Sequence, residues 1–336
     1  MNTRRDFIKT SLAAGAGITL AGKTLGEPNA DNGDEIKIGI IGLDTSHSPA
    51  FAKTINDPAR ESMKGFKVVS AYKHGSSTIK SSYERIPRYT KDFEDMGITI
   101  EKSIKALLRK VDVVMLETND GTLHLEQAME VFEAKKPVFI DKPVAATLRD
   151  TIKIYDLAEK NNIPLFSSSS LRYFENSEKI RKREGVGDVL GADTFGPMKL
   201  EPSHSDLYWY GIHGSEMLFT ILGTGCQSVR RISMGESELV VGEWESGVMG
   251  NFRGHLSGSS GYGGILYGAS GTMQTGKYGG YVPLVEEIIK FFKTGKSPVP
   301  ASETLEIYAF MDAAMMSRKR NGAVVTIKEA MEEARS

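Results

Sequence analysis

Two kinds of segment alternate along residues 36–165: short runs of apolar residues, and longer stretches in which apolar residues recur with helical spacing. The apolar runs predict strands at 36–42, 66–72, 98–100, 111–117, 138–140 and 164–168. The helical spacing predicts helices at 49–56, 103–110, 122–134 and 147–161. Regular strand–helix alternation is typical of a doubly wound parallel Rossmann sheet, whose strand ends meet at one edge.

After residue 170 the pattern changes to glycine-rich, β-prone segments. They predict strands at 189–200, 229–234, 238–244, 249–253 and 265–267, with helices at 211–222, 281–293 and 302–319. This pattern favours a mostly antiparallel open sheet with helices on one face. We therefore expect a leader at 1–33, a Rossmann dinucleotide-binding domain at 34–165, and an open-sheet substrate and oligomerisation domain with C-terminal helices at 166–336.

The leader combines paired arginines, Arg4-Arg5, with a following Phe7-Ile8-Lys9 and a short apolar run at 11–22. This run is too short to span a bilayer, and the arginine pair matches a twin-arginine export signal. We expect the twin-arginine machinery to export the protein to the periplasm.

Composition excludes several classes of protein. The 42 basic and 43 acidic residues are balanced, which argues against nucleic-acid binding. The single cysteine allows no intramolecular disulfide, and the six histidines have no metal-ligand spacing, so no metal is expected. No apolar run after the leader predicts a stable membrane span.

The triplet Asp141-Lys142-Pro143 directly follows the strand predicted at 138–140. A side chain at the carboxyl end of a parallel strand lies in the ligand crevice of an open α/β sheet. The proline ends the strand and stiffens the turn that carries Lys142. The alternative is a solvated lysine at the start of a loop.

Four motifs occur in a recognisable order: the strand–turn 36–44, the turn 117–119 with His124, the triplet 141–143, and Gly211-Ile212-His213. Together they resemble the glucose–fructose oxidoreductase / inositol dehydrogenase (Gfo/Idh/MocA) family, from about residue 35 to the end. The resemblance implies an N-terminal Rossmann domain, a C-terminal open sheet and NAD or NADP as cofactor. It places Lys142 beside nicotinamide and substrate, and aligns His213 with the family's catalytic histidine.

The resemblance also implies a wider set of site residues. The cofactor-binding candidates are Gly42, Thr45, Ser46, His47, Lys73, Thr118, Asn119, His124 and Asp141. The substrate-binding candidates are Arg172, Tyr173, Asp206 and Trp209. Lys73 favours a 2′-phosphate, and so NADP, or is a solvated loop residue. Trp209 lies in an aromatic cluster that suits stacking on a sugar face.

The dinucleotide turn departs from the expected G-x-G-x-x-G, because only Gly42 remains of the three glycines. Asp44 stands where the backbone approaches phosphate, and a carboxylate there repels it. Thr45, Ser46 and His47 can still donate hydrogen bonds to an anion at the start of the next helix.

The acid–base residues depart as well, because Trp209 stands where the family often has an aspartate. On an α-helix, Asp206, Tyr210 and His213 would share one face. Tyr210 is then a candidate proton donor, or Asp206 a residue that orients His213; alternatively, His213 is a buried structural histidine.

These observations predict an oxidoreductase acting on a CH–OH group of a sugar or polyol, with a tightly held cofactor that is recycled in each turnover. Redox-assisted glycoside hydrolysis and a non-catalytic carbohydrate-binding protein are the alternatives. We expect a small carbohydrate as ligand and a homo-oligomer in solution.

Overall fold

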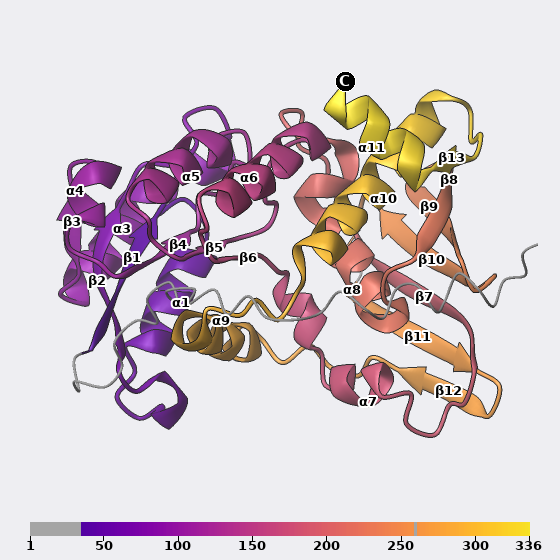
Figure 1. Cartoon of the computed structure of the whole chain (residues 1–336), viewed down its shortest axis with the longest axis horizontal. Coiled ribbons are helices and arrows are strands. Elements are labelled where there is room, and N and C mark those ends of the chain that lie inside the picture. Colours follow the sequence, from indigo (N-terminus) through magenta and orange to yellow (C-terminus); the bar gives the residue numbers. More distant parts are fainter. Residues whose placement is uncertain (1–34, 259–260) are drawn as a thin grey trace, which may run out of the picture.

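The computed structural model describes residues 35–258 and 261–336, which form two domains side by side (Figure 1). The first domain contains a six-stranded parallel sheet in the order β3-β2-β1-β4-β5-β6. Its strands are β1 (Ile36–Ile41), β2 (Phe66–Tyr72), β3 (Thr99–Glu101), β4 (Val113–Leu116), β5 (Val138–Ile140) and β6 (Leu165–Phe166). The predicted Rossmann sheet is confirmed.

Helices cover both faces of this sheet. They are α1 (His47–Ile55), α2 (Lys80–Tyr83), α3 (Ile86–Asp95), α4 (Ile104–Leu108), α5 (His124–Glu133) and α6 (Leu148–Lys160). Apolar residues of α4, α5 and α6 pack on one face, and those of α1 pack on the other. Helix α6 begins where the sequence predicts, because the Thr147 hydroxyl accepts a hydrogen bond from the backbone N–H of Asp150.

The second domain contains a seven-stranded sheet in the order β12-β11-β7-β10-β9-β8-β13. Its strands are β7 (Val189–Pro197), β8 (Cys226–Met234), β9 (Ser237–Trp244), β10 (Met249–His255), β11 (Gly263–Gly268), β12 (Gly271–Gln274) and β13 (Val325–Thr326). Strands β7 and β10 pair in parallel, whereas the other neighbours are antiparallel. The prediction of a mostly antiparallel sheet is therefore confirmed.

The two faces of the second sheet differ. Its helices are α7 (Ser177–Arg181), α8 (Ile212–Leu222), α10 (Ala301–Lys319) and α11 (Ile327–Arg335). Helices α8 and α10 share a hydrophobic core with the inner face. The outer face exposes Phe195, Ile232, Met234 and Met249, with Met234 75% exposed.

Helix α9 (Val282–Thr294) follows the second sheet in sequence but packs on the first domain. Figure 1 shows it alongside α1, beneath the Rossmann sheet. Its Leu284, Ile288 and Phe291 join the core around Phe51. The chain thus crosses between the domains more than once, which fixes the crevice between them.

Candidate active site

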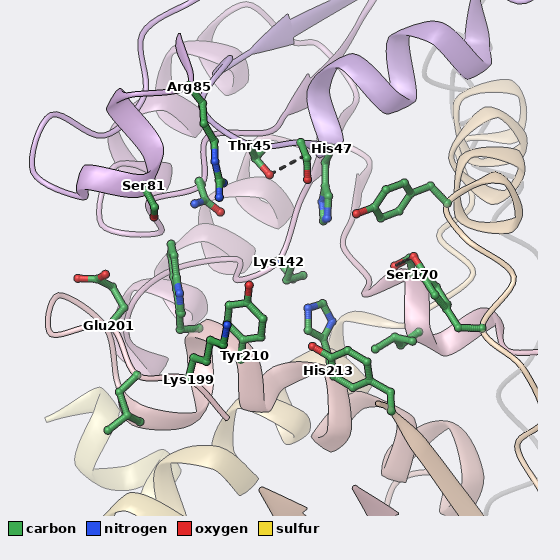
Figure 2. Close-up of a pocket in the computed structure, with 18 residues that line it drawn as sticks. Thr45, His47, Ser81, Arg85, Lys142, Ser170, Lys199, Glu201, Tyr210 and His213 are labelled. Carbon is green, nitrogen blue, oxygen red and sulfur yellow. Dashed lines mark hydrogen bonds between the residues drawn. The ribbon is translucent and has the colours of Figure 1, made fainter. Parts of the chain in front are cut away.

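A cavity of about 530 Å³ opens between the two domains at the carboxyl edge of the Rossmann sheet. From the first domain, the turn between β1 and α1 and the turn after β5 reach it. Figure 2 shows Thr45, His47 and Arg85 on one side, Tyr210 and His213 on the other, and Lys142 between them. The residues predicted to carry the chemistry therefore converge on one space.

Lys142 lies where the sequence places it, at the carboxyl end of β5. The backbone N–H of Asp141 donates to the carbonyl of Leu116 at 2.9 Å, which holds the turn against the neighbouring strand. Lys142 is half-buried, is followed by Pro143 in a cis peptide bond, and lines the cavity. Its ammonium is therefore available to an oxygen atom of a bound ligand.

His213 enters the cavity from the second residue of α8. Its Nδ1 lies 2.6 Å from the Ser169 hydroxyl oxygen, which leaves Nε2 for a ligand. Burial, together with the positive charge of Lys142, holds the pKa of His213 well below its usual value. The imidazole is thus neutral near pH 7. Because the Ser169 hydroxyl can donate or accept, Nε2 can be either acceptor or donor.

Asp44 does not face the cavity, so the predicted repulsion of phosphate is wrong. Its side chain is fully buried and accepts hydrogen bonds from the backbone N–H groups of Ser76 at 2.8 Å and Asn119 at 3.0 Å. Gly42, with φ of +93°, lies against Thr118, where a Cβ would come within 2.5 Å of the backbone. Asp44 therefore joins the ends of β1, β2 and β4.

His47 occupies the position of the third glycine of the expected fingerprint. Its Nδ1 lies 2.7 Å from Oδ2 of Asp141, and its ring packs against Phe51 and Tyr281. Burial by itself would raise the pKa of Asp141, but the hydrogen bond and charge of His47, with Lys142, lower it. Beside this pair, burial and the charge of Asp141 raise the pKa of Glu117 well above its usual value.

Other cofactor candidates split between the cavity and the interior. Asn119 lines the cavity, whereas Thr118 and Lys73 do not contribute to its wall. His124 is fully buried, and its Nδ1 and Nε2 lie 3.1 and 2.6 Å from the carbonyls of Val144 and Thr118. It connects two strand-end turns, which corrects its prediction as a cofactor-binding residue.

Two predicted substrate residues, Arg172 and Tyr173, also lie outside this cavity. Arg172 is 4% exposed and pairs with Glu216 at 2.9 Å and Glu303 at 2.6 Å. Two carboxylates thus neutralise it inside the second domain. It holds α8 and α10 together rather than binding substrate.

Asp206 is separated from His213, contrary to the helical-face prediction. Residues Leu207–Gly211 form a π-helical turn, and its i→i+5 hydrogen bonding shifts the angular phase of the residues before α8. Asp206 forms ion pairs with Arg231, at 3.0 Å, and Arg318. Trp209 and Tyr210 still reach the cavity, with the Trp209 ring 5.1 Å from that of His204.

The sequence analysis did not include about half of the cavity wall. The additional lining residues are Ser81, Arg85, Ser170, Leu171, Lys199, Leu200, Glu201, Tyr262, Tyr278 and Tyr281. They come from loops and helix ends distant in sequence from the four motifs. Tyr281 illustrates the difficulty, because only the return of α9 to the first domain places it beside His47.

Comparisons with known proteins agree with this arrangement. Residues 36–168 match the model of the oxidoreductase family with an NAD-binding Rossmann fold, Gfo/Idh/MocA, and residues 1–21 match a twin-arginine translocation signal sequence. This chain carries the NAD-binding domain of the Gfo/Idh/MocA oxidoreductase family. The signal lies outside the described residues, and among those described no helix is long and apolar enough to cross a membrane.

Three proteins similar to this chain share between 16% and 26% sequence identity with it. An uncharacterized oxidoreductase of Streptococcus pneumoniae is 26% identical over 106 residues, a match that spans 30% of this chain and 29% of the relative. A probable dehydrogenase from Thermotoga maritima has a TM-score of 0.72 at 18% identity, covering 88% of this chain and 100% of that one. The myo-inositol dehydrogenase of Lactobacillus casei, solved with NAD(H) and myo-inositol, has a TM-score of 0.69 at 16% identity, covering 87% and 96%. At these identities the structures show a shared fold.

The cavity wall fits a dinucleotide of the kind this family binds. The turn before α1 opens onto the cavity through Thr45 and Ser46, and a helix N-terminus favours an anion. Arg85, Lys142 and Lys199 add three cations to a wall with one carboxylate, that of Glu201. Because Asp44 is turned inward, the departure from the glycine pattern leaves no carboxylate facing a phosphate at that turn.

Proposed function

We propose that this protein is an NAD(P)-dependent oxidoreductase acting on a CH–OH group of a sugar or polyol. The observation that carries the proposal is the convergence of Lys142, Tyr210 and His213 on one cavity at the carboxyl edge of an NAD-binding domain. Ligands of open α/β sheets bind at this edge. Hydroxyl-bearing side chains and the Trp209 ring give the wall the mixed polar and aromatic character that suits a carbohydrate.

The bound nicotinamide supplies the hydride acceptor. Lys142 contributes a positive charge that stabilises negative charge developing on the substrate oxygen. His213, held neutral, accepts the hydroxyl proton at Nε2 while its Nδ1–H donates to Ser169. Tyr210, whose ring lies 6.3 Å from that of His213, is a second hydroxyl close to the proton path.

Export adds a constraint on the cofactor. Nicotinamide cofactors are not freely supplied outside the cytoplasm, and the twin-arginine route moves folded proteins. We therefore propose that the chain binds its cofactor before export, carries it to the periplasm and restores it within each turnover. Replacing Arg4 and Arg5 by lysine should retain the precursor in the cell, with Lys23→Arg as control; unchanged periplasmic yield would contradict the proposal.

The test of the function is direct. The protein is purified from the cytoplasm, the released small molecules are identified by mass spectrometry, and a panel of sugars and polyols is added while nicotinamide absorbance is recorded. The proposal expects a nicotinamide nucleotide and an absorbance change with at least one polyol. A protein that binds sugars but neither retains nor binds a nucleotide would instead be a carbohydrate-binding protein.

We further propose a homo-oligomer formed through the outer face of the second sheet. Phe195 on β7, Met249 on β10, and Ile232 and Met234 on β8 are exposed there, and β9 lies between β10 and β8. Light scattering of the wild type and of Met234→Lys would measure it. An unchanged mass in the variant would contradict this interface.

A further inference from the structure

Buried carboxylate oxygens without partners lie directly behind the cavity. Glu117, at the end of β4, is fully buried, and neither of its carboxylate oxygens has a hydrogen-bond partner among the described residues. Oδ1 of Asp141, at the end of β5, also lacks a partner within the same part of the chain. Buried polar atoms are almost always paired, because an unpaired one loses its hydration without compensation. Three such oxygens close together therefore indicate that a ligand binds them.

The third member of this group is His47, from the first turn of α1. One potential ligand atom each from His47, Glu117 and Asp141 lies within 4.8 Å of the other two. Ligand atoms about 2.0–2.2 Å from a common ion are separated by at most about 4.4 Å, so these three atoms need only small shifts to share one ion. Glu117 and Asp141 directly follow the neighbouring strands β4 and β5, and His47 is the first residue of α1, the helix that follows β1 next to β4.

The charge of His47, Glu117 and Asp141 indicates a divalent cation. Two carboxylates and a neutral imidazole carry a charge of −2 when ionised, and burial makes such a charge costly unless it is compensated. Lys142 lies nearby but forms no ion pair with Glu117 or Asp141 in the described structure. A divalent cation would balance the two carboxylates fully.

We propose that His47, Glu117 and Asp141 form a binding site for one divalent transition-metal ion at the carboxyl edge of the Rossmann sheet. One imidazole and two carboxylates suit Zn²⁺ or Mn²⁺, since imidazole favours the former and carboxylates the latter. Asp141 holds the His47 ring through Oδ2 and leaves Oδ1 for the ion. The local spacing of histidines could not indicate this site, because its ligands lie 70 and 24 residues apart in sequence.

The proposed ion lies next to the cavity floor. His47 lines the cavity, whereas Glu117 and Asp141 lie behind it. Three protein ligands leave at least one coordination position open. Because His47 lines the cavity, an oxygen atom of a ligand or a water molecule could reach such a position from the cavity. The site does not depend on a nicotinamide, so it goes beyond the proposed function.

Metal content and affinity test the site. The full-length protein is stripped with a chelator and titrated separately with ZnCl₂ and MnCl₂ by calorimetry, and bound metal is counted by mass spectrometry. We expect one ion per chain. Glu117→Gln keeps the shape but loses the charge, and should weaken binding by at least about 10–100-fold. Glu101→Gln is the matched control, because Glu101 is a buried carboxylate of β3 outside the group, bonded to Lys110 at 2.6 Å; it should bind metal as the wild type does.

Thermal melts provide a second readout, which distinguishes metal bound at this site from metal bound by other side chains. Without metal, Glu117→Gln should melt close to or above the wild-type temperature, because glutamine keeps the shape of a side chain whose carboxylate oxygens have no hydrogen-bond partner among the described residues. Metal should raise the melting temperature of the wild type and of Glu101→Gln, but not that of Glu117→Gln. Equal metal binding by wild type and Glu117→Gln, or no stoichiometric binding by the wild type, would overturn the proposal. So would a metal-free Glu117→Gln that fails to fold, since its carboxylate would then serve a partner within the protein. None of these outcomes decides whether the protein binds a nucleotide, because nucleotide binding is measured in a separate experiment.

Discussion

Single residues at the strand ends divide into those that face the cavity and those that connect the turns beneath it. Lys142 and His213 face it, and both were named from the sequence. Lys142 stands in a local pattern, a strand end followed by proline, whereas His213 was named through the family resemblance. Asp44 and His124 were misplaced. Their residue types indicate hydrogen bonding but not the direction in which a side chain points, and neighbours 75 and 20 residues away decide that direction.

Lys142→Met should reduce turnover by about 10²–10³-fold, because it removes a charge that stabilises the developing oxyanion. The protein should stay folded, since the side chain lines a cavity. Lys102→Met, on an exposed turn, is the control and should keep wild-type turnover. Full activity of Lys142→Met with the best substrate of the panel would rule out this role.

Asp44→Ala should lower the free energy of unfolding by about 2–4 kcal/mol, because it leaves two buried backbone N–H groups, those of Ser76 and Asn119, without an acceptor. Urea denaturation measures this loss. Asp44→Gly should not tighten nucleotide binding either, since the carboxylate does not face the cavity. A wild-type midpoint for Asp44→Ala would show that the two N–H groups find other acceptors.

Among the secondary-structure elements, apolar strands were the most predictable. β2 and β5 have the predicted bounds, because a buried parallel strand is a continuous apolar run. Strands β12 and β13 were missed, since they are short edge strands with alternating or partial burial. Helices α2 and α3 were also missed, because Ser82 and Phe93 are their only fully buried residues and the rest of each helix is largely polar. The π-helical turn before α8 has no local signal, and it separates Asp206 from His213.

The packing of α8 on β10 depends on Gly214, which follows His213. A Cβ at this position would lie 2.1 Å from the ring of Phe252. Gly214→Ala should therefore destabilise the protein by about 1–3 kcal/mol, despite the better helix propensity of alanine. Thermal melts measure the effect, with Ser302→Ala on the exposed start of α10 as control. A raised melting temperature for Gly214→Ala would contradict this packing.

At the scale of the whole molecule, His204 is one of the contacts that join the two domains. Its Nε2 accepts a hydrogen bond from the backbone N–H of Gly121 at 2.9 Å, so it must be unprotonated at that nitrogen. Burial lowers the pKa of His204 from 6.5 to about 4, although the charge of Asp120 opposes the shift. The packing of α9 on the first domain is a second connection between the domains. No local pattern in the sequence indicates this connection or the one made by His204.

The pKa of His204 predicts a loss of stability in acid. With a folded-state pKa below the unfolded value, its contribution is complete above pH 6.5 and is lost as pH falls from 6.5 to about 4. The loss should be on the order of 3 kcal/mol. His204→Gln retains an acceptor but does not titrate, so its stability should fall less over this range, while the carboxylates common to both proteins cancel. Parallel curves for the two proteins would contradict the assignment.

The central claim, hydride transfer from a carbohydrate carbon at the Lys142–His213 site, is tested most directly with deuterium. The protein is incubated with sugars and polyols deuterated at the carbinol carbon, and the nicotinamide nucleotide recovered from it, or the sugar product when the cofactor is recycled, is weighed by mass spectrometry. The account predicts transfer of deuterium from the labelled carbon with wild-type protein and its strong reduction with Lys142→Met. A protein that binds the sugars while leaving every deuterium in place would contradict it.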